Sequence, residues 1–400
     1  MRNPWLGVGN GSLFQGPIPE SLSKLSRLTK LELGSNALNG SLPSGLGELS
    51  NLVYLDISSN QLSGFLSEAH FSKLLKLKIL IASSNSLSMN VSSDWVPPYR
   101  LRNLDMGSIR LGPSFPPWLE TQKLKLMFLD MLNTSINDEM PSWFWDQLSL
   151  NLSLLNITFN RIRGEFPNPL KVPAFADVSM KSNLLEGPLP IMSNGVRLLD
   201  LSDNRFSGSI LPNIRKLQTL YLQHNRLSQT IPRSLGNCES LETIDLGSNT
   251  LLGEIPIWVR ERLKRLRILS LRSNSFSGDI PEGLCNLTSL QVLDLSGNRL
   301  TGPIPRSLRG LIAMSRPRAS HCDFFYGSYR GQYYKESLSM KVKGGTHTYT
   351  NILSLVISID VLENALPGEI PEELMSLKGM VILNLSGTDS REAFRMKSGT

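Results

Sequence analysis

Residue types that carry catalysis or bind metals are few in this chain and far apart. Four histidines lie in separate stretches with no shared nucleophile pattern: His70, His224, His321 and His347. The His-Cys-Asp triplet at 321–323 has no second cluster to complete a zinc site. The glycines at 7–11 loosely resemble a phosphate loop, but no strand, lysine or kinase signature accompanies them. The sequence therefore predicts no enzyme, no metal and no cofactor.

The cysteines are too few for a disulfide framework. Cys238, Cys285 and Cys322 have neither a framework pattern nor a metal-ligand spacing. Because their number is odd, at least one thiol is free or pairs outside this chain.

The charge of the chain is basic but dispersed. The net charge is +7 and the pI is about 9.3, yet Lys and Arg are scattered, and no basic stripe carries interleaved aromatic residues. We therefore expect a weakly basic solvated face and no nucleic-acid partner.

The elements that position all of these residues come from an internal repeat of about 24 residues. Its template, Leu-x-x-Leu/Ile-x-Leu-x-x-Asn-x-Leu-x-Gly-x-Ile-Pro, is complete over 241–256, and close copies follow over 266–281 and 290–305. Two further good copies begin at Leu28 and Leu52. Weaker copies centre on Asn85, Ile109, Thr134, Asn160, Asn183, Asn204 and Asn225. This signal predicts an α/β-type repeat solenoid, namely a plant-type leucine-rich-repeat right-handed superhelix with a parallel β-sheet on its concave side.

Each position of the template has a physical role. Leu-x-Leu is a short strand that directs alternate side chains into the core, and we expect such strands at 28–33, 241–246, 266–271 and 290–295. The Asn amide can serve buried backbone groups of adjacent coils. Where Ile109 and Thr134 replace that Asn, we expect a weaker ladder of amides, because each lost hydrogen bond costs about 1–3 kcal/mol.

The repeat also divides the chain. About thirteen repeats, the first degenerate, fill 1–305, and two further repeats fill 351–388. Between them, 306–350 is a non-repeat insertion that is rich in aromatic residues, and 389–400 is a tail without any pattern. We expect the insertion to project from the solenoid and to influence ligand or co-receptor contact, with a disordered linker as the open alternative.

Ligands of such solenoids usually bind the concave strand face. One column of that face is occupied by regularly recurring aspartates, which we interpret as scaffold: Asp56, Asp105, Asp130, Asp200, Asp245 and Asp294. The less regular residues are the candidates for ligand contact: Lys181, Tyr221, Gln223, His224 and Arg272. Tyr and Arg are favoured anchors at protein interfaces, whereas surface variation without binding is the open alternative.

Eight sequons offer acceptors for N-glycosylation: Asn10, Asn39, Asn90, Asn133, Asn151, Asn156, Asn286 and Asn384. A chain rich in Ser and Asn yields several by chance, so they indicate secretion only weakly. Asn156 falls on a concave strand, where a glycan would block contact with a protein ligand.

Several segments outside the template resemble plant leucine-rich-repeat receptor-like proteins, especially those of the fungal-xylanase-receptor type. They lie at 67–71, 90–98, 111–119, 143–145, 261–264 and 341–344. The resemblance covers nearly the whole chain. It implies a receptor on the extracellular face of the plasma membrane, with one span, no kinase of its own, receptor-kinase co-receptors and an adaptor, and a microbial protein or peptide as ligand. It also implies a cysteine where Ser307 stands, which leaves Cys285 without an evident partner.

Departures from that pattern leave alternatives open. The chain lacks the apolar run of a signal peptide, the cysteine-bearing cap, the membrane-proximal repeats and a membrane span. A secreted inhibitor of microbial cell-wall-degrading enzymes is also a leucine-rich solenoid without a span, and a non-functional truncated product would likewise lack these parts. Such inhibitors are shorter and uninterrupted, so the ectodomain of a receptor, as a fragment, is the function that we expect.

Overall fold

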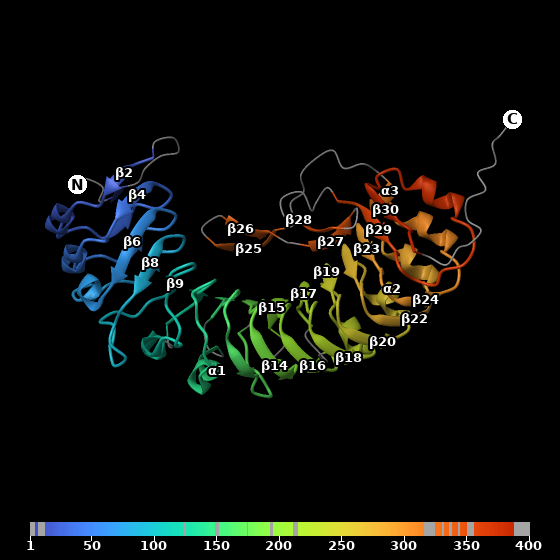
Figure 1. Cartoon of the computed structure of the whole chain (residues 1–400), viewed down its shortest axis with the longest axis horizontal. Coiled ribbons are helices and arrows are strands. Elements are labelled where there is room, and N and C mark those ends of the chain that lie inside the picture. Colours follow the sequence, from blue (N-terminus) through green and yellow to red (C-terminus); the bar gives the residue numbers. More distant parts are fainter. Residues whose placement is uncertain are drawn as a thin grey trace. The chain divides into compact units, whose positions relative to one another are not determined.

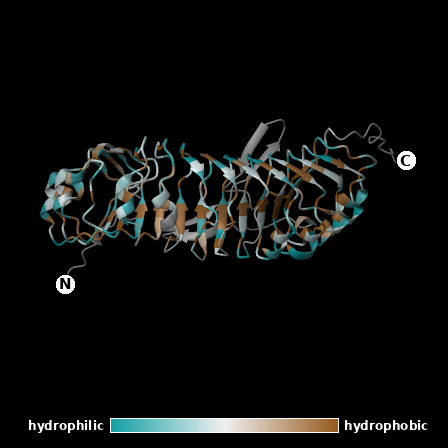
Figure 2. Cartoon of the chain, turned by 90° about the horizontal axis from the view of Figure 1, so that it is seen from below, coloured by the Kyte–Doolittle hydropathy of each residue, from teal (hydrophilic) through white to brown (hydrophobic). Residues whose placement is uncertain are grey.

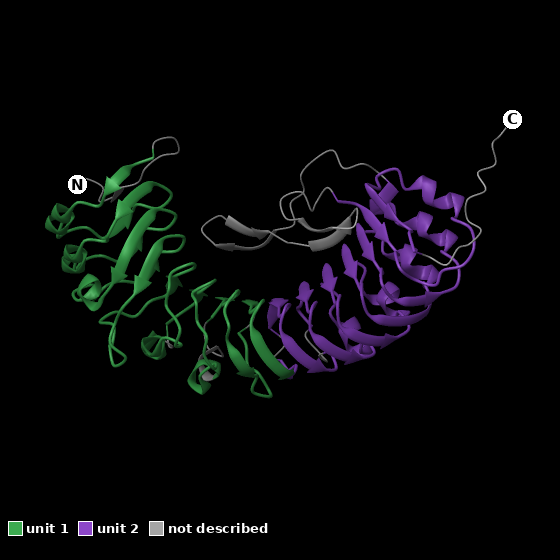
Figure 3. Ribbon diagram, in the orientation of Figure 1, with its two compact units in different colours: residues 1–187 green, residues 188–400 purple. Residues whose placement is uncertain are grey.

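The computed structural model of this 400-residue chain describes most of its residues. The described ranges are 5–6, 13–122, 125–148, 152–173, 175–192, 195–210, 215–315, 325–329, 332–335, 338–342, 345–349 and 356–387. The chain divides into two compact units, 1–187 and 188–400, and each is considered by itself (Figure 3). Both are stacks of similar coils, whose elements are labelled in Figure 1.

In the first unit, a parallel main sheet takes one short strand from each coil. In spatial order its strands are β1 (Trp5–Leu6), β3 (Lys30–Glu32), β5 (Tyr54–Asp56), β7 (Ile79–Ile81), β9 (Asn103–Asp105), β10 (Phe128–Asp130), β11 (Leu154–Asn156) and β13 (Ala176–Ser179). The middle residues Leu31, Leu55 and Leu80 are partners in register, and all three are buried. Because one coil cannot bury its apolar side alone, the stack forms a continuous leucine core.

The rest of each coil in the first unit holds a second short strand and a short helix. The second strands are β2 (Gln15–Pro17), β4 (Ala37–Gly40), β6 (Gln61–Leu66), β8 (Ser86–Met89), β12 (Arg163–Glu165) and β14 (Leu184–Pro188). The helices are η1 (Glu20–Lys24), η2 (Ser44–Glu48), η3 (Glu68–Phe71), η4 (Pro117–Gln122) and α1 (Ser142–Leu148).

The second unit repeats this plan. Its main sheet contains β15 (Val196–Asp200), β17 (Thr219–Tyr221), β19 (Thr243–Asp245), β21 (Ile268–Ser270), β23 (Val292–Asp294), β29 (Ser358–Asp360) and β30 (Ile382–Asn384). The second strands are β16 (Arg205–Gly208), β18 (Arg226–Gln229), β20 (Thr250–Gly253), β22 (Ser275–Asp279) and β24 (Arg299–Thr301). The helices are η5 (Arg233–Asn237), α2 (Trp258–Arg262), η6 (Glu282–Asn286), η7 (Arg306–Gly310), α3 (Ile312–Ser315) and η9 (Glu372–Ser376).

This architecture confirms the predicted repeat solenoid with a parallel sheet. The strands β3, β19, β21 and β23 lie inside the ranges predicted from the template but are shorter, because each covers only the first apolar residue of Leu-x-Leu and one residue on either side. Leu269 and Leu293 are register partners, so both point to the same side of the sheet, into the core. Hydrophobic and hydrophilic residues interleave along the coils (Figure 2), as the alternation of strand side chains requires.

The amide ladder accounts for the recurring Asn. Oδ1 of Asn249 accepts the N–H of Leu227 at 3.0 Å, and its Nδ2 donates to the carbonyl oxygens of Leu222 and Leu246 at 2.9 and 3.0 Å. One side chain therefore serves main-chain groups of two coils, where burial makes an unmade hydrogen bond costly. The same donation to the carbonyl three residues earlier occurs at Asn36, Asn60, Asn85, Asn160, Asn183, Asn204, Asn225, Asn274, Asn298 and Asn364.

The two departures from this ladder differ. The hydroxyl of Thr134 lies 3.1 Å from the carbonyl oxygen of Met131, so it takes over one of the bonds that an Asn would make. Its own N–H donates to Oδ1 of Asn160 at 3.0 Å. Ile109 is fully buried and offers no polar group in its place. The predicted weakening of the ladder therefore concerns Ile109 more than Thr134.

Contacts between aromatic rings explain several segments that lie outside the template. Phe71 contacts Trp95 and Trp95 contacts Trp118 with inclined ring planes, and the ring centroids are 5.8 Å apart at both contacts. Further along the unit, the rings of Trp145 and Phe166 meet edge to face at 4.9 Å. Such pairs contribute about 0.5–1.5 kcal/mol beyond the burial of their area. These segments therefore fill the helical side of coils in which the leucine pattern is weak.

The insertion contains regular structure in its described parts. β25 (Phe325–Tyr329) pairs antiparallel with β26 (Gln332–Lys335), and β27 (Leu338–Val342) pairs antiparallel with β28 (Gly345–Tyr349). The first ten residues of the predicted insertion, 306–315, instead form the coil elements η7 and α3, so the preceding repeat continues to Ser315. β23 pairs directly with β29, so the chain leaves and rejoins the main sheet between neighbouring coils. The other residues of 316–355 and the tail 389–400 lie outside the described residues, as do the predicted Asn10, Asn151, His321 and Cys322.

Candidate functional site

The candidate site is the face of each main sheet that points away from the leucine core, called the sheet face below. On the three-residue strands of the main sheets the middle side chain points to the core side, where it is buried except at Leu383 of the last strand, β30, and the two flanking side chains belong to the sheet face. They form two columns in register. In the first unit the first column begins Lys30, Tyr54 and Ile79, and the second begins Glu32, Asp56 and Ile81.

The recurring aspartates occupy the second column and act on the backbone. Oδ1 of Asp130 accepts the N–H of Leu132 at 2.9 Å, and Oδ1 of Asp245 accepts that of Gly247 at 3.0 Å. Asp294 accepts both the N–H and the hydroxyl of Ser296, at 3.1 and 2.6 Å. Each carboxylate thus closes the turn after its strand as an Asx-turn does. This geometry supports the scaffold interpretation of that column.

Burial, together with repulsion between carboxylates on neighbouring strands, raises the pKa values of Asp130 and Asp294 in this column. Burial, with the neighbouring Asp105 as a second cause, raises the pKa of Asp130 to about 6. Burial also raises the pKa of Asp294 to about 6, with the like charge of Asp360 on the next strand adding to it. Asn156, in the same column, avoids the repulsion, since its Nδ2 donates to Oδ2 of Asp130 at 2.9 Å.

The five residues predicted to contact a ligand lie in different environments. Tyr221 ends β17, Gln223 follows it, and Arg272 follows β21; these three are buried, with 6–8% of their surface exposed. The buried hydroxyls of Thr219, Thr243 and Ser270 share this part of the sheet face. A ligand that contacts Tyr221 or Arg272 therefore needs this face to be more open than it is in this structure.

The remaining two predicted residues are more exposed, although Lys181 follows its strand at the same distance as Gln223 and Arg272 follow theirs. Lys181 is a partly exposed residue of the first unit, two positions after the end of β13. His224 has a φ of 56° and its Nδ1 lies 3.0 Å from Oδ1 of Asp203, on the exposed turn of the preceding coil. Ligand contact by any of the five stays a prediction.

The more open part of the sheet face, at the start of the first unit, was missed by the sequence reasoning. Lys30, Glu32 and Tyr54 are each partly exposed. Nζ of Lys30 lies 2.7 Å from Oε1 of Glu32 and 4.8 Å from the centroid of the Tyr54 ring. The two residues on either side of Leu31 on β3 are both charged. This local signal in the sequence could have identified the group.

The sequons fall into two classes. Asn39, Asn90, Asn133 and Asn286 are exposed. In contrast, Nδ2 of Asn156 donates to Asp130, and Nδ2 of Asn384 donates to Oδ2 of Asp360 at 3.2 Å. Because a glycan would be attached at this same nitrogen, the second class is poorly suited to modification.

The described residues hold no group of three or more His, Cys, Asp or Glu side chains placed to bind a metal ion. Over the same residues, no helix is long and apolar enough to cross a membrane. Cys285 forms no disulfide within the described part of the chain, and the hydroxyl of Ser307 donates to the carbonyl oxygen of Glu282 at 2.6 Å.

Comparison with known proteins agrees with this architecture. The family profile for two-copy leucine-rich repeats matches residues 215–258 and 264–308, and the single-repeat profile matches 51–72 and 195–217. The chain is similar to receptor-like protein EIX2 of Solanum lycopersicum, with 35% identity over 375 residues that cover 79% of this chain and 36% of that protein. It therefore spans about a third of the length of this relative.

Solved structures of plant receptor ectodomains share the fold. The ectodomain of the Arabidopsis thaliana receptor kinase GASSHO1/SCHENGEN3, in complex with CASPARIAN STRIP INTEGRITY FACTOR 2, has a TM-score of 0.72 at 29% identity, over 94% of this chain and 40% of that one. The Arabidopsis receptor kinase HAESA, in complex with the peptide hormone IDA and the co-receptor SERK1, has a TM-score of 0.65 at 28% identity, over 93% and 59%. Together with the repeat geometry, these similarities identify the chain as a leucine-rich-repeat receptor-like protein of the EIX type.

Proposed function

We propose that this chain is the ligand-recognition region of a plant cell-surface immune receptor. Such a receptor lies at the plasma membrane with its repeats outside the cell. It has no kinase of its own and signals through receptor-kinase co-receptors and an adaptor. Its ligand is a microbial protein or peptide bound on the sheet face. The similarity to EIX2, and the two ectodomains that are solved with peptide ligands, support this proposal.

The observation that carries the proposal is the Lys30–Glu32–Tyr54 group on the sheet face. The scaffold residues of this face form hydrogen bonds with the backbone of the following turn, as Asp130 does. Lys30 instead makes an ion pair and a cation–π contact with neighbouring side chains of the same partly exposed surface. Tyr and charged residues that are ordered before binding lose little conformational entropy on contact. A charged, aromatic and ordered surface is suited to a protein ligand.

Binding to a fungal xylanase tests this proposal. The chain, produced through a plant secretory pathway and immobilised, is expected to bind the enzyme saturably. Tyr54→Ala and Lys30→Glu should each weaken binding about tenfold or more if they are anchors. Lys24→Glu makes the same charge change on the exposed helix η1 and serves as the matched control. Equal affinity of all four proteins would contradict the assignment of this surface, and loss of xylanase activity on binding would favour the inhibitor alternative.

We propose that the insertion forms a second region of contact with the ligand or a co-receptor. Two antiparallel hairpins in 325–349 support a folded segment over a disordered linker. A plant cell expressing the receptor with 316–350 replaced by a Gly/Ser linker of equal length is expected to display it normally and to lose elicitor response. Normal display with a full response would leave the linker interpretation standing.

A further inference from the structure

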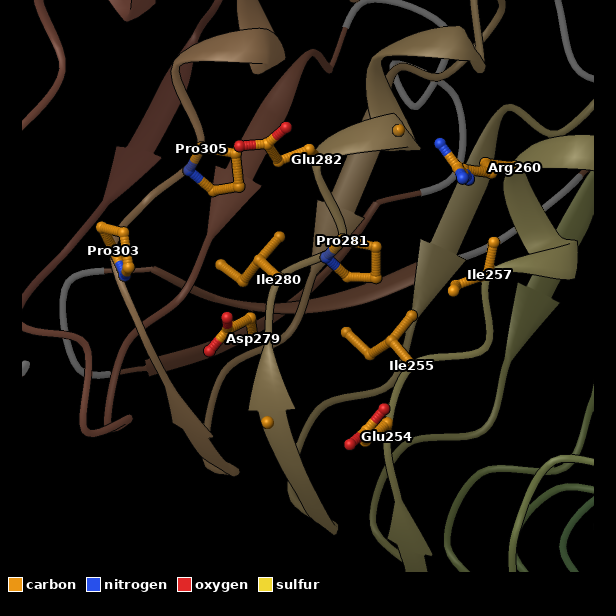
Figure 4. A pocket seen from close by; sticks show the side chains of 12 residues that line it. Glu254, Ile255, Ile257, Arg260, Asp279, Ile280, Pro281, Glu282, Pro303 and Pro305 are labelled. Atoms are coloured by element: carbon orange, nitrogen blue, oxygen red, sulfur yellow. The ribbon is translucent and has the colours of Figure 1, made fainter.

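A second surface of the molecule has the features of a binding groove. It lies in the second unit, between the ends of β20 and β22 and the segments that lead into α2, η6 and η7 (Figure 4). Its volume is about 630 Å³, which is within the range of pockets that hold ligands of several hundred daltons. Ile255 and Ile280 form part of its floor, and Ile257 stands at its rim with 57% of its surface exposed. The groove is separate from the sheet face, because its residues lie at the ends of the second strands or follow them.

Glycines of neighbouring coils position the charged side chains of this groove. Gly278 has a φ of 77°, and a Cβ placed on it would lie 3.0 Å from Cγ of Glu254. A Cβ on Gly302, where φ is 72°, would overlap the carboxylate of Asp279, and one on Gly283 would overlap the side chain of Arg260. Each charged side chain thus lies against bare backbone of the next coil. This packing limits its freedom before any ligand arrives.

The charge of the groove is opposite to that of the whole chain. Three carboxylates, those of Glu254, Asp279 and Glu282, line the groove together with one guanidinium, that of Arg260. None of the three carboxylates forms an ion pair with a residue in the part of the chain that the structure describes. The net charge of +7 on the chain makes this local excess of acid a distinct feature.

The guanidinium of Arg260 has one N–H donor that lacks an acceptor within the described part of the chain. Nε of Arg260 is buried and has no hydrogen-bond partner among the described residues. A buried donor without an acceptor is unfavourable, and because this Nε is enclosed, a bound acceptor reaches it only when the Arg260 side chain moves away from Gly283. A main-chain carbonyl oxygen has the right chemistry, and a bare cation does not.

We propose that this groove binds an extended segment of a partner polypeptide in which basic and apolar side chains alternate. The apolar side chains cover Ile257, Ile280 and Pro281. The basic side chains reach Glu254 and Asp279, and a carbonyl oxygen of the segment accepts from Arg260. Charge complementarity with the three carboxylates selects a basic peptide over an acidic or purely apolar one. This site lies beyond the sheet face and does not depend on the ligand proposed for that face.

A labelled peptide of sequence Leu-Lys-Leu-Lys-Leu is the probe, and Leu-Glu-Leu-Glu-Leu is the reference peptide. Fluorescence anisotropy with the full chain is expected to show saturable binding of the basic peptide, which weakens as salt increases. The double variant Glu254→Gln/Asp279→Asn keeps the packing on Gly278 and Gly302, and should bind about tenfold more weakly. Ile257→Ser should also reduce the affinity.

The control variant is Glu165→Gln. Glu165 lies against Gly187 in the same way that Glu254 lies against Gly278, but outside the groove, so its loss should leave affinity unchanged. Thermal unfolding of each variant shows that the fold is intact, and xylanase binding on the sheet face is measured on the same samples. The proposal is overturned if the double variant binds as well as the unmodified chain, if the acidic peptide binds equally well, or if no saturable binding occurs.

Discussion

Replacing Asp294 by Asn should stabilise the protein near neutral pH. Asp294 is buried on the sheet face, and its pKa is raised from an ordinary value near 3.8 to about 6 by burial and by Asp360. In the folded state the carboxyl group therefore binds its proton more tightly than in the unfolded chain. The free energy of unfolding contributed by this group is highest below pH 4 and falls as the pH rises through 6.

The magnitude follows from the shift. About two pKa units correspond to about 3 kcal/mol between the acidic and the neutral limit. An amide carries no charge to bury. Its oxygen can still accept from the N–H and hydroxyl of Ser296, and its nitrogen can donate to Asp360, as Asn384 does from the other side. We expect Asp294→Asn to raise the free energy of unfolding by about 2–3 kcal/mol at pH 8, with little change at pH 4.

Chemical unfolding monitored by circular dichroism at pH 4 and pH 8 measures the free energy of unfolding at the two limits. Glu261→Gln, which removes an exposed carboxylate of the same unit, is the control and should leave the pH dependence unchanged. If Asp294→Asn destabilises the chain at pH 8, or retains the full pH dependence of the unmodified protein, the electrostatic account of this column is wrong.

Three further outcomes are expected. Asn249→Ala removes an amide that serves two coils and should lower the free energy of unfolding by about 2–3 kcal/mol in the same assay; a change below about 0.5 kcal/mol would exclude a structural role for the ladder. The buried hydroxyl of Tyr99 has no partner among the described residues, so Tyr99→Phe should raise the thermal midpoint rather than lower it. Peptide mapping of the secreted chain should find glycan on the exposed Asn90 and none on Asn156, and a glycan on Asn156 would contradict the hydrogen bond assigned to its nitrogen.

The fold could be predicted from sequence because its determinants are local and repeated. Leu-x-Leu sets the strand, and Asn249 reaches groups that the same template places at fixed distances in the adjacent coil. The scaffold role of the aspartates was predictable for the same reason, since Asp294 bonds only two residues ahead. Even the departure at Thr134 is intelligible, because a hydroxyl can replace part of what an amide donates.

The candidate site was less predictable because it depends on burial and on contacts between coils. Tyr221 and Arg272 have the residue types of interface anchors, but the sequence does not show that they are buried in this structure. His224 was expected on the strand face and lies in a turn against Asp203, because its φ is positive. In the Lys30 group, Lys30 contacts Glu32 on its own strand and Tyr54 on the strand of the next coil. The repeat template does not specify which of its variable residues contact one another.

The groove shows why function is harder to read than fold in a repeat protein. The Gly-x-Ile-Pro segment is a turn signal in every coil, and the sequence alone assigns its x position no role. Only stacking places Glu254 against Gly278 of the next coil and Asp279 against Gly302 of the coil after that. A charged surface then arises from residues about one repeat apart, each ordinary in its own coil. The residues that recur in every repeat build the scaffold. A binding site must therefore be sought at the variable positions, for which the repeat template specifies no residue type.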